Sequence, residues 1–477
     1  MQIPEYLEYD GTGLARLVRD GEVTPEELAQ CAAAQVATWN PHINAVLELF
    51  SEPDPATAGE GGATPFGGVP FLIKDLVIQA EGRLCEMGSR LAAGHVAPQD
   101  SDLMARFRQA GLVTLGRTAT PEMGYNVATE TVADGICRNP WDLGRSPGGS
   151  SGGAAAAVAA GIVPLAHAND GGGSIRIPAA CCGLVGLKPT RGRVPIGPGA
   201  AEGLNGFGIE FAVTRSVRDA AALLDAVQGP GVGDPYVIAP PVVPYATALE
   251  RPPGPLRIAV ATGAWSGVPV DEEIRGAVEA VARACESQGH AVEVARPPLD
   301  AGAFARANTD LWSASIAHWV VDLCAATGRQ ADHTTLEQST LAVYEHGLSL
   351  SAVDLLHAED VFNGVNRDFG RFFQQYDLLL TPTTAQLPWP VGRHASDGGS
   401  YTAQSWTDHV FSDAPFTAVF NCTGQPAISL PLARSASGLP IGIQFAARYG
   451  REDLLLALAA VFEQSMPWPQ VAPGPVS

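Results

Sequence analysis

The sequence contains no run of 18 or more apolar residues, the length that a helix needs to cross a bilayer. Its longest run of small apolar residues, 154–168, is interrupted by Gly161 and Pro164 and is typical of a buried core segment. The first ten residues lack the basic start and the apolar stretch of a signal peptide. We therefore expect a cytoplasmic protein without a membrane-spanning segment.

Basic residues are scarce, because 29 lysines and arginines stand against 50 aspartates and glutamates and give a net charge of −21. An acidic surface repels phosphate backbones and anionic lipid headgroups, which argues against direct binding of nucleic acid or a membrane. The eight cysteines form neither a C-x-x-C pair nor a Cys/His cluster with zinc spacing. We expect buried free thiols and no metal site.

The pattern of apolar residues predicts an α/β fold. A strand-like segment at 256–260, a helical one at 271–288 and a strand-like one at 291–294 follow the β-α-β order that is typical of parallel sheets. Residues 304–360 are helical in pattern and contain no strong strand. One domain over 1–477 with a helical insertion is the simplest interpretation. Further strands are predicted at 377–380, 427–431 and 441–445, and a closing helix at 453–464.

Near the start of the chain, residues 14–38 have helical spacing of apolar positions. Within them, Thr24 is a predicted N-cap, because proline follows it and Glu27 stands three positions later. Residues 52–68 are rich in glycine, proline and alanine and predict an exposed loop.

Two loops rich in glycine and serine stand out, at 148–153 and at 169–174. Glycine-rich turns let backbone amides point at one spot, where they bind a phosphate or stabilise the oxyanion of acyl transfer. Neither loop has a phosphate-binding motif. In the second loop, Ser174 directly follows a run of three glycines, which favours acyl transfer.

A serine nucleophile needs a base. Residues 149–153 match the G-x-S-x-G elbow of α/β-hydrolases, but the elbow needs a preceding strand, and 144–147 is typical of a loop. His394 and His409 are weak candidates for its late histidine. Lys74 lies inside the apolar, strand-like segment 69–76, where burial would lower the pKa of its ammonium group. From the residues alone, Lys74 is either a base or the partner of the adjacent aspartate, and Ser150 and Ser151 are not distinguished.

Together these motifs resemble the amidase signature family, from about residue 10 to 465. The resemblance implies a large twisted mixed β-sheet sandwiched between helices. It further implies a catalytic core at about 65–220 and 365–465, and a helical insertion near the active site at about 300–362. The matching segments are 67–70, Lys74-Asp75, 148–153, 171–179, 182–190, Phe420-Asn421, 424–427, 440–442 and Gln444.

The resemblance also implies roles for individual residues. Ser174 is the nucleophile, Ser150 passes the proton on, and Lys74 receives it. This mechanism requires no metal or organic cofactor. His167, on a strand-like segment, is expected to be a satisfied core histidine rather than a catalytic one. The implied oxyanion donors are the amides of Gly171, Gly172, Gly173 and Ser174, and the implied structural pair is Asp170 and Arg176.

Within that family, residues 139–146, 166–170 and 449–455 resemble the 6-aminohexanoate cyclic-dimer hydrolases, which open nylon-type cyclic amides. That pattern has a short polar residue where Tyr125 stands and a small residue near Trp312. We expect these two aromatic residues and Gly149 to contact the substrate.

The implied function is a serine amidohydrolase that forms an acyl-enzyme with amides, cyclic amides, aryl anilides or carbamates (urethanes), with a homodimer as an expected assembly. The alternative is an amidase-type subunit of a glutamine-dependent tRNA amidotransferase, which works only inside a complex. The acidic charge weighs against direct contact of this chain with RNA.

Overall fold

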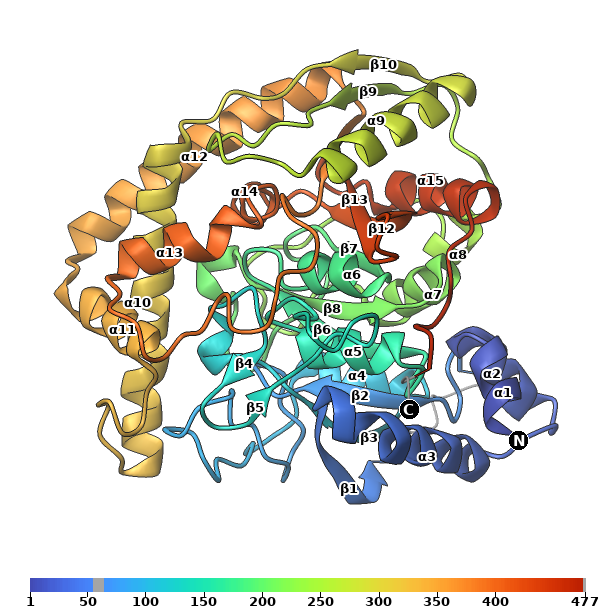
Figure 1. Ribbon diagram of the computed structural model, residues 1–477, viewed down its shortest axis with the longest axis horizontal. Helices are drawn as coiled ribbons and strands as arrows, with labels where there is room; N and C mark the ends of the chain where they lie inside the picture. Colours follow the sequence, from blue (N-terminus) through green and yellow to red (C-terminus); the bar gives the residue numbers. More distant parts are fainter. Residues whose placement is uncertain (55–63, 475–477) are drawn as a thin grey trace.

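The computed structural model describes residues 1–54 and 64–474, and its centre is an eight-stranded mixed sheet in the order β10-β9-β11-β13-β12-β7-β8-β6 (Figure 1). Strand β9 pairs in parallel with β10 and β11, and the other neighbours are antiparallel. The predicted β-α-β unit is therefore confirmed. The strands are β6 (Leu165–Asp170), β7 (Val185–Lys188), β8 (Ile209–Thr214), β9 (Arg257–Val260), β10 (Ala291–Val294), β11 (Leu378–Pro382), β12 (Ala427–Arg434) and β13 (Pro440–Ala447).

A second, three-stranded sheet has the order β1-β3-β2 and contains β1 (Val46–Asp54), β2 (Pro70–Lys74) and β3 (Val113–Thr118). Strand β2 is buried along its whole length and packs against β6, the edge strand of the large sheet. Lys74 is the last residue of β2, so the packing of the two sheets carries this lysine to the end of β6. A short hairpin pairs β4 (Glu130–Thr131) with β5 (Gly135–Ile136).

Helices pack on both faces of the large sheet. On β13, an added Cβ at Gly442 would lie 2.3 Å from Ala180 of α6, whereas Phe445 stacks on Phe462 of α15. Positions three apart on a strand point to opposite faces, so α6 and α15 cover opposite faces. These and the other helices outside the insertion are α1 (Ile3–Glu8), α2 (Gly11–Arg19), α3 (Pro25–Ile43), α4 (Asp102–Gln109), α5 (Gly152–Ala159), α6 (Arg176–Cys182), α7 (Val217–Val227), α8 (Tyr245–Ala248), α9 (Glu272–Ser287), α13 (Ala403–Ser412), α14 (Ala418–Thr423) and α15 (Glu452–Ser465), with short 3-10 turns η1 (Glu122–Gly124) and η2 (Leu204–Gly206).

The predicted N-cap at Thr24 is confirmed. Its hydroxyl accepts from the backbone N–H of Glu27 at 3.2 Å, and the Glu27 carboxylate accepts from the backbone of Thr24 at 2.9 Å. The helical pattern of 14–38 nevertheless belongs to two helices, because α2 ends at Arg19 and α3 starts anew at Pro25. Of the loop expected at 52–68, residues 55–63 lie outside the described residues.

The helical insertion consists of α10 (Ala301–Thr327), α11 (Gln338–Ser349) and α12 (Ala352–Gln375), which pack against one another at one side of the sheet (Figure 1). The last helix continues to Gln375, beyond the predicted end near residue 362. The buried face of α10 joins a hydrophobic cluster with residues beside the nucleophile loop, among them Ile177 and Leu204. Within residues 1–54 and 64–474, no helix is long and apolar enough to cross a membrane.

Candidate active site

Lys74 lies buried between the two sheets, with 1% of its surface exposed. Its Nζ lies 2.7 Å from the Oγ of Ser150 and 2.5 Å from the Oδ1 of Asn169. The peptide bond between Gly149 and Ser150 is cis. Burial lowers the pKa of Lys74 to about 7, although the carboxylate of Glu210 acts in the opposite direction. A lysine in this position is available as a proton acceptor near neutral pH.

The backbone of Lys74 is held by His167. The Lys74 N–H donates to Nδ1 of His167 at 3.2 Å, so that nitrogen carries no hydrogen. The ring therefore carries its hydrogen on Nε2, which donates to Oε2 of Glu210 at 2.6 Å. Both ring nitrogens thus have protein partners, as expected for a core histidine.

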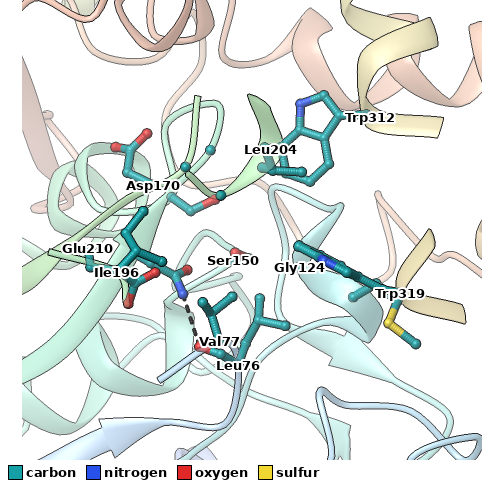
Figure 2. Close-up of a pocket in the computed structure, with 16 residues that line it drawn as sticks. Leu76, Val77, Gly124, Ser150, Asp170, Ile196, Leu204, Glu210, Trp312 and Trp319 are labelled. Atoms are coloured by element: carbon teal, nitrogen blue, oxygen red, sulfur yellow. Dashed lines mark hydrogen bonds between the residues drawn. The ribbon is translucent and has the colours of Figure 1, made fainter. Parts of the chain in front are cut away.

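Ser174 lies on the turn between β6 and α6 and is 8% exposed. Ser150 and Ser174 line the same cavity, which has a volume of about 40 Å³. Figure 2 shows Ser150 in the wall of this cavity. Among the described residues, no hydrogen bond joins the two Oγ atoms. The structure therefore brings Lys74 and Ser150 into hydrogen-bond contact. It places Ser174 in the wall of the same cavity, without a hydrogen bond to Ser150 among the described residues. Catalytic hydrogen bonds are often long before substrate binds.

A buried ion pair holds the loop at 169–174, which we call the nucleophile loop, in place. Asp170 and Arg176 are fully buried, and two hydrogen bonds of 2.9 Å join the carboxylate to the guanidinium. Burial alone would raise the pKa of Asp170, but the charge and hydrogen bonds of Arg176 outweigh it and hold the pKa at about 2. The carboxylate is therefore ionised at every pH at which the enzyme would work. Arg176 also donates to the Thr417 carbonyl, Gln444 and Asn421.

The same carboxylate contacts one of the four predicted oxyanion donors. Oδ1 of Asp170 accepts from the N–H of Gly173 at 2.6 Å, so the Gly173 amide already has an acceptor. The amides of Gly171, Gly172 and Ser174 have no hydrogen-bond partner among the described residues. The carbonyl of Gly172 is held by the Thr417 hydroxyl at 2.6 Å. Three of the four predicted donors thus remain free to bind an oxyanion.

The cavity walls are mainly apolar. Figure 2 shows Trp312, Leu204 and Trp319 among the residues that line the cavity. Tyr125 does not line it, because its ring stacks on Trp312 with centroids 4.4 Å apart and planes inclined by 6°. Gly149 also lies outside the lining, and an added Cβ there would meet the backbone carbonyl of Ala128 at 2.8 Å. Of the three predicted substrate-binding residues, only Trp312 reaches the cavity.

A larger cavity of about 470 Å³ adjoins the first one. The two share six residues in their walls: Leu76, Val77, Ile196, Gly203, Leu204 and Trp319. A substrate longer than a single amide group would therefore extend from Ser174 into this second space. None of these six residues belongs to a motif that the sequence singles out for substrate binding.

Gly171 packs tightly against Leu204 and against Trp312 of the insertion. A Cβ added at Gly171 would lie 2.5 Å from Cδ1 of Leu204 and 2.8 Å from Cζ2 of Trp312. We expect Gly171→Ala to lower kcat/KM by about 100-fold, because a displacement of about 1 Å in a catalytic loop costs that much. Adding Trp312→Phe should restore part of the loss. Steady-state kinetics would measure both effects.

The matched control for this substitution is Gly276→Ala on α9, where an added Cβ would meet nothing within 4 Å. It should leave kcat/KM unchanged. Full activity in Gly171→Ala would contradict the tight packing of Trp312 on the loop.

Comparison with known proteins agrees with this geometry. The Amidase family model matches residues 27–456. A 6-aminohexanoate-cyclic-dimer hydrolase of Paenarthrobacter ureafaciens is 38% identical over 97% of this chain and 96% of its own length. An acylamidase of Rhodococcus erythropolis is 34% identical, with the same coverage of 97% and 96%. The solved structure of 6-aminohexanoate cyclic dimer hydrolase superposes with a TM-score of 0.91 at 37% identity and covers 97% of this chain and 98% of that one.

The predicted family and fold are therefore confirmed. The match runs through both glycine-rich loops, the large sheet and the helical insertion. This chain belongs to the amidase signature family of amide hydrolases.

Proposed function

We propose that this protein cleaves the C–N bond of uncharged amides, cyclic amides, aryl anilides or carbamates through an acyl-enzyme on Ser174. One observation carries the proposal. The buried Nζ of Lys74 lies 2.7 Å from Ser150 Oγ, at the edge of a cavity that Ser150 shares with Ser174. A lysine without an acidic hydrogen-bond partner, beside a serine, is suited to accept a proton rather than to form an ion pair.

In this mechanism, Ser174 Oγ attacks the carbonyl carbon while its proton passes to Ser150, whose own proton moves to the neutral Nζ of Lys74. The amides of Gly171, Gly172 and Ser174 then hold the oxyanion, and each such donor contributes about 2.7–4 kcal/mol in the transition state. The proton returns by the same route to the leaving nitrogen as the C–N bond breaks. Water next attacks the acyl ester and regenerates Ser174.

The walls of the site support the substrate class. Trp312, Trp319 and Leu204 offer flat and apolar surface, which favours substrates with aromatic or aliphatic groups. Of the relatives named above, one is named as a hydrolase of the 6-aminohexanoate cyclic dimer and the other as an acylamidase, which agrees with this substrate class. A carbamate differs from an amide only beyond the carbonyl, so the same attack cleaves urethanes.

A substrate panel tests the proposal. Purified protein and its Ser174→Ala variant would be incubated with an aliphatic amide, a nitroanilide, the cyclic nylon dimer, an aryl carbamate and glutamine. Turnover of a non-glutamine substrate that disappears in the variant is expected. Ser412→Ala, on α13 away from the cavity, is the control and should keep full activity. Turnover of glutamine alone would favour the amidotransferase subunit instead.

Size-exclusion chromatography of the same preparation would test two further predictions. A homodimer is expected to elute at twice the mass of 49.5 kDa. Activity of that species without any added partner would distinguish a free-standing hydrolase from a subunit that works only inside a complex.

The pH dependence of catalysis follows from Lys74. Its pKa is lowered to about 7, first by burial, and only the neutral amine accepts a proton. We expect kcat/KM on a nitroanilide to rise tenfold per pH unit below about 7 and to level off above it, so that the value at pH 5 is about 100-fold below the plateau. A flat profile between about pH 6 and 10 would contradict Lys74 as the base.

A further inference from the structure

We propose that Asn169 and Glu210 are positioning residues that, with His167, hold Lys74 toward Ser150 and set the pH range in which it accepts a proton. This inference rests on the proposed function, because it assigns a task to groups that surround the proposed base. None of the three belongs to the predicted triad or to the four predicted oxyanion donors. They form one buried polar cluster under Lys74, which we call the lysine platform.

The topology of the large sheet builds the lysine platform. Asn169 on β6 and Glu210 on β8 are direct cross-strand partners, so their side chains lie on the same face of the sheet. His167 stands two positions before Asn169 and shares that face. Strand β2 packs against β6 and ends at Lys74, which brings the amine over the three side chains.

Asn169 is fixed in one orientation. Its Nδ2 donates to the Leu76 carbonyl at 3.0 Å, so its Oδ1 faces Lys74 and accepts from Nζ at 2.5 Å. Its backbone N–H and C=O both bond to the Ser151 hydroxyl, at 3.3 and 3.2 Å. A neutral lysine has two N–H groups and one lone pair. With one N–H bound to Asn169, the lone pair is free to accept the proton of Ser150.

Glu210 acts in two ways. Through His167, its carboxylate holds the backbone N–H of Lys74 in place. Glu210 is 5% exposed and lines the catalytic cavity, so its negative charge acts on Lys74 with little screening by water. That charge stabilises the ammonium form and opposes the effect of burial.

The other charges around Lys74 are compensated. On β6, Asp170 also favours the ammonium form of Lys74, but less than Glu210 does, and its carboxylate is paired with Arg176 of α6. Directly after β2, Asp75 pairs with Arg117 of β3. The packed helices α3 and α5 bury only uncharged side chains toward this region. Glu210 is therefore the carboxylate near Lys74 that lacks a cationic partner of its own among the described residues.

Two substitutions should shift the pKa of Lys74 in opposite directions. Glu210→Gln keeps an acceptor for His167 but removes the negative charge, so the ammonium form loses stabilisation and the acid limb of the pH profile should move to lower pH. Asn169→Asp places a negative charge against Nζ, so the acid limb should move to higher pH by about 1–3 units. A purely structural role would lower activity without such opposite shifts.

The experiment measures the second-order rate of Ser174 sulfonylation by a small sulfonyl fluoride between pH 5 and 10, which requires no knowledge of the natural substrate. The sulfonyl group bonds to Oγ, fluoride leaves, and the serine proton passes to the base. The matched control is Glu452→Gln, which removes another buried carboxylate, paired with Arg193, and should not move the acid limb. Thermal melting checks that each variant folds. If Asn169→Asp does not fold, the shift of the acid limb in Glu210→Gln is sufficient to test the proposal.

The possible results separate the two proposals. A wild-type protein that is not sulfonylated at Ser174, or that turns over amides equally well as Ser174→Ala, would overturn the proposed function. A reactive wild-type protein whose acid limb stays in place in Glu210→Gln, or moves the same way in both variants, would overturn the lysine platform alone.

Discussion

Ser174→Ala is expected to lower kcat by about a millionfold, and adding Lys74→Met to it is expected to lower kcat no further. The two side chains act in one proton path through Ser150, so the loss of either member stops the same step. Once the nucleophile is gone, a base has no serine to activate. The remaining turnover would come from the free amides of the oxyanion loop and from substrate binding.

Single-turnover and steady-state kinetics of Ser174→Ala, Lys74→Met and the double variant would test this expectation. Thermal melting of each protein would show that the loss concerns chemistry and not folding. Independent losses that multiply in the double variant would contradict a shared path. Lys74→Met activity near that of the wild-type protein would remove Lys74 from the mechanism and leave the elbow-type histidine alternatives to be tested.

The sequence predicts the site best where the chemistry is encoded locally. The loops at 148–153 and 169–174 carry their glycines and serines in short runs, and Lys74 lies inside an apolar strand, so all three are visible without a fold. The structure places Lys74 at the end of β2 and Ser150 2.7 Å away. Their approach itself depends on the packing of β2 on β6, which no local pattern predicts.

The parts that were missed depend on contacts between distant segments. Glu210 meets Asn169 only because β8 pairs with β6, and nothing around Glu210 marks it as functional. Asn169 is easier to predict from the sequence than Glu210, since it directly precedes Asp170 in the loop at 169–174. Tyr125 is predicted to contact the substrate because the related pattern has a short polar residue at its position, but its ring stacks on Trp312 instead.

The hydrogen-bond partner of the Gly173 amide could not be predicted from the sequence for a similar reason. A run of glycines shows that backbone amides are accessible, but not which of them already has an acceptor. The carboxylate of Asp170 folds back on Gly173 and takes one of the four. A carboxylate just before such a run is a signal for this arrangement, because its side chain reaches amides three positions ahead in the manner of a helix cap.

Removal of either member of the Asp170–Arg176 pair is expected to cost about 3–5 kcal/mol of the free energy of unfolding, because it leaves an unpaired charge in the protein interior. Both side chains are fully buried, and the pKa of Asp170 is held at about 2 by its partner, so it cannot become neutral at ordinary pH in the native protein. Urea denaturation of Asp170→Ala and Arg176→Met would measure the cost. Asp368→Ala on α12, which removes an exposed ion pair with Arg371, is the control and should change the free energy of unfolding very little.

The double variant of Asp170 and Arg176 shows whether the unpaired charge or the lost packing accounts for most of the loss in the free energy of unfolding. If the unpaired charge is the main cost, Asp170→Ala with Arg176→Met should be less destabilised than the sum of the single variants, since no buried charge is left alone. Its activity should nevertheless stay low, because the amides of Gly173 and Ile175 lose the carboxylate that holds the loop. Simple additivity of the two costs would mean that Asp170 and Arg176 stabilise the fold through their separate contacts, and that their mutual attraction contributes little.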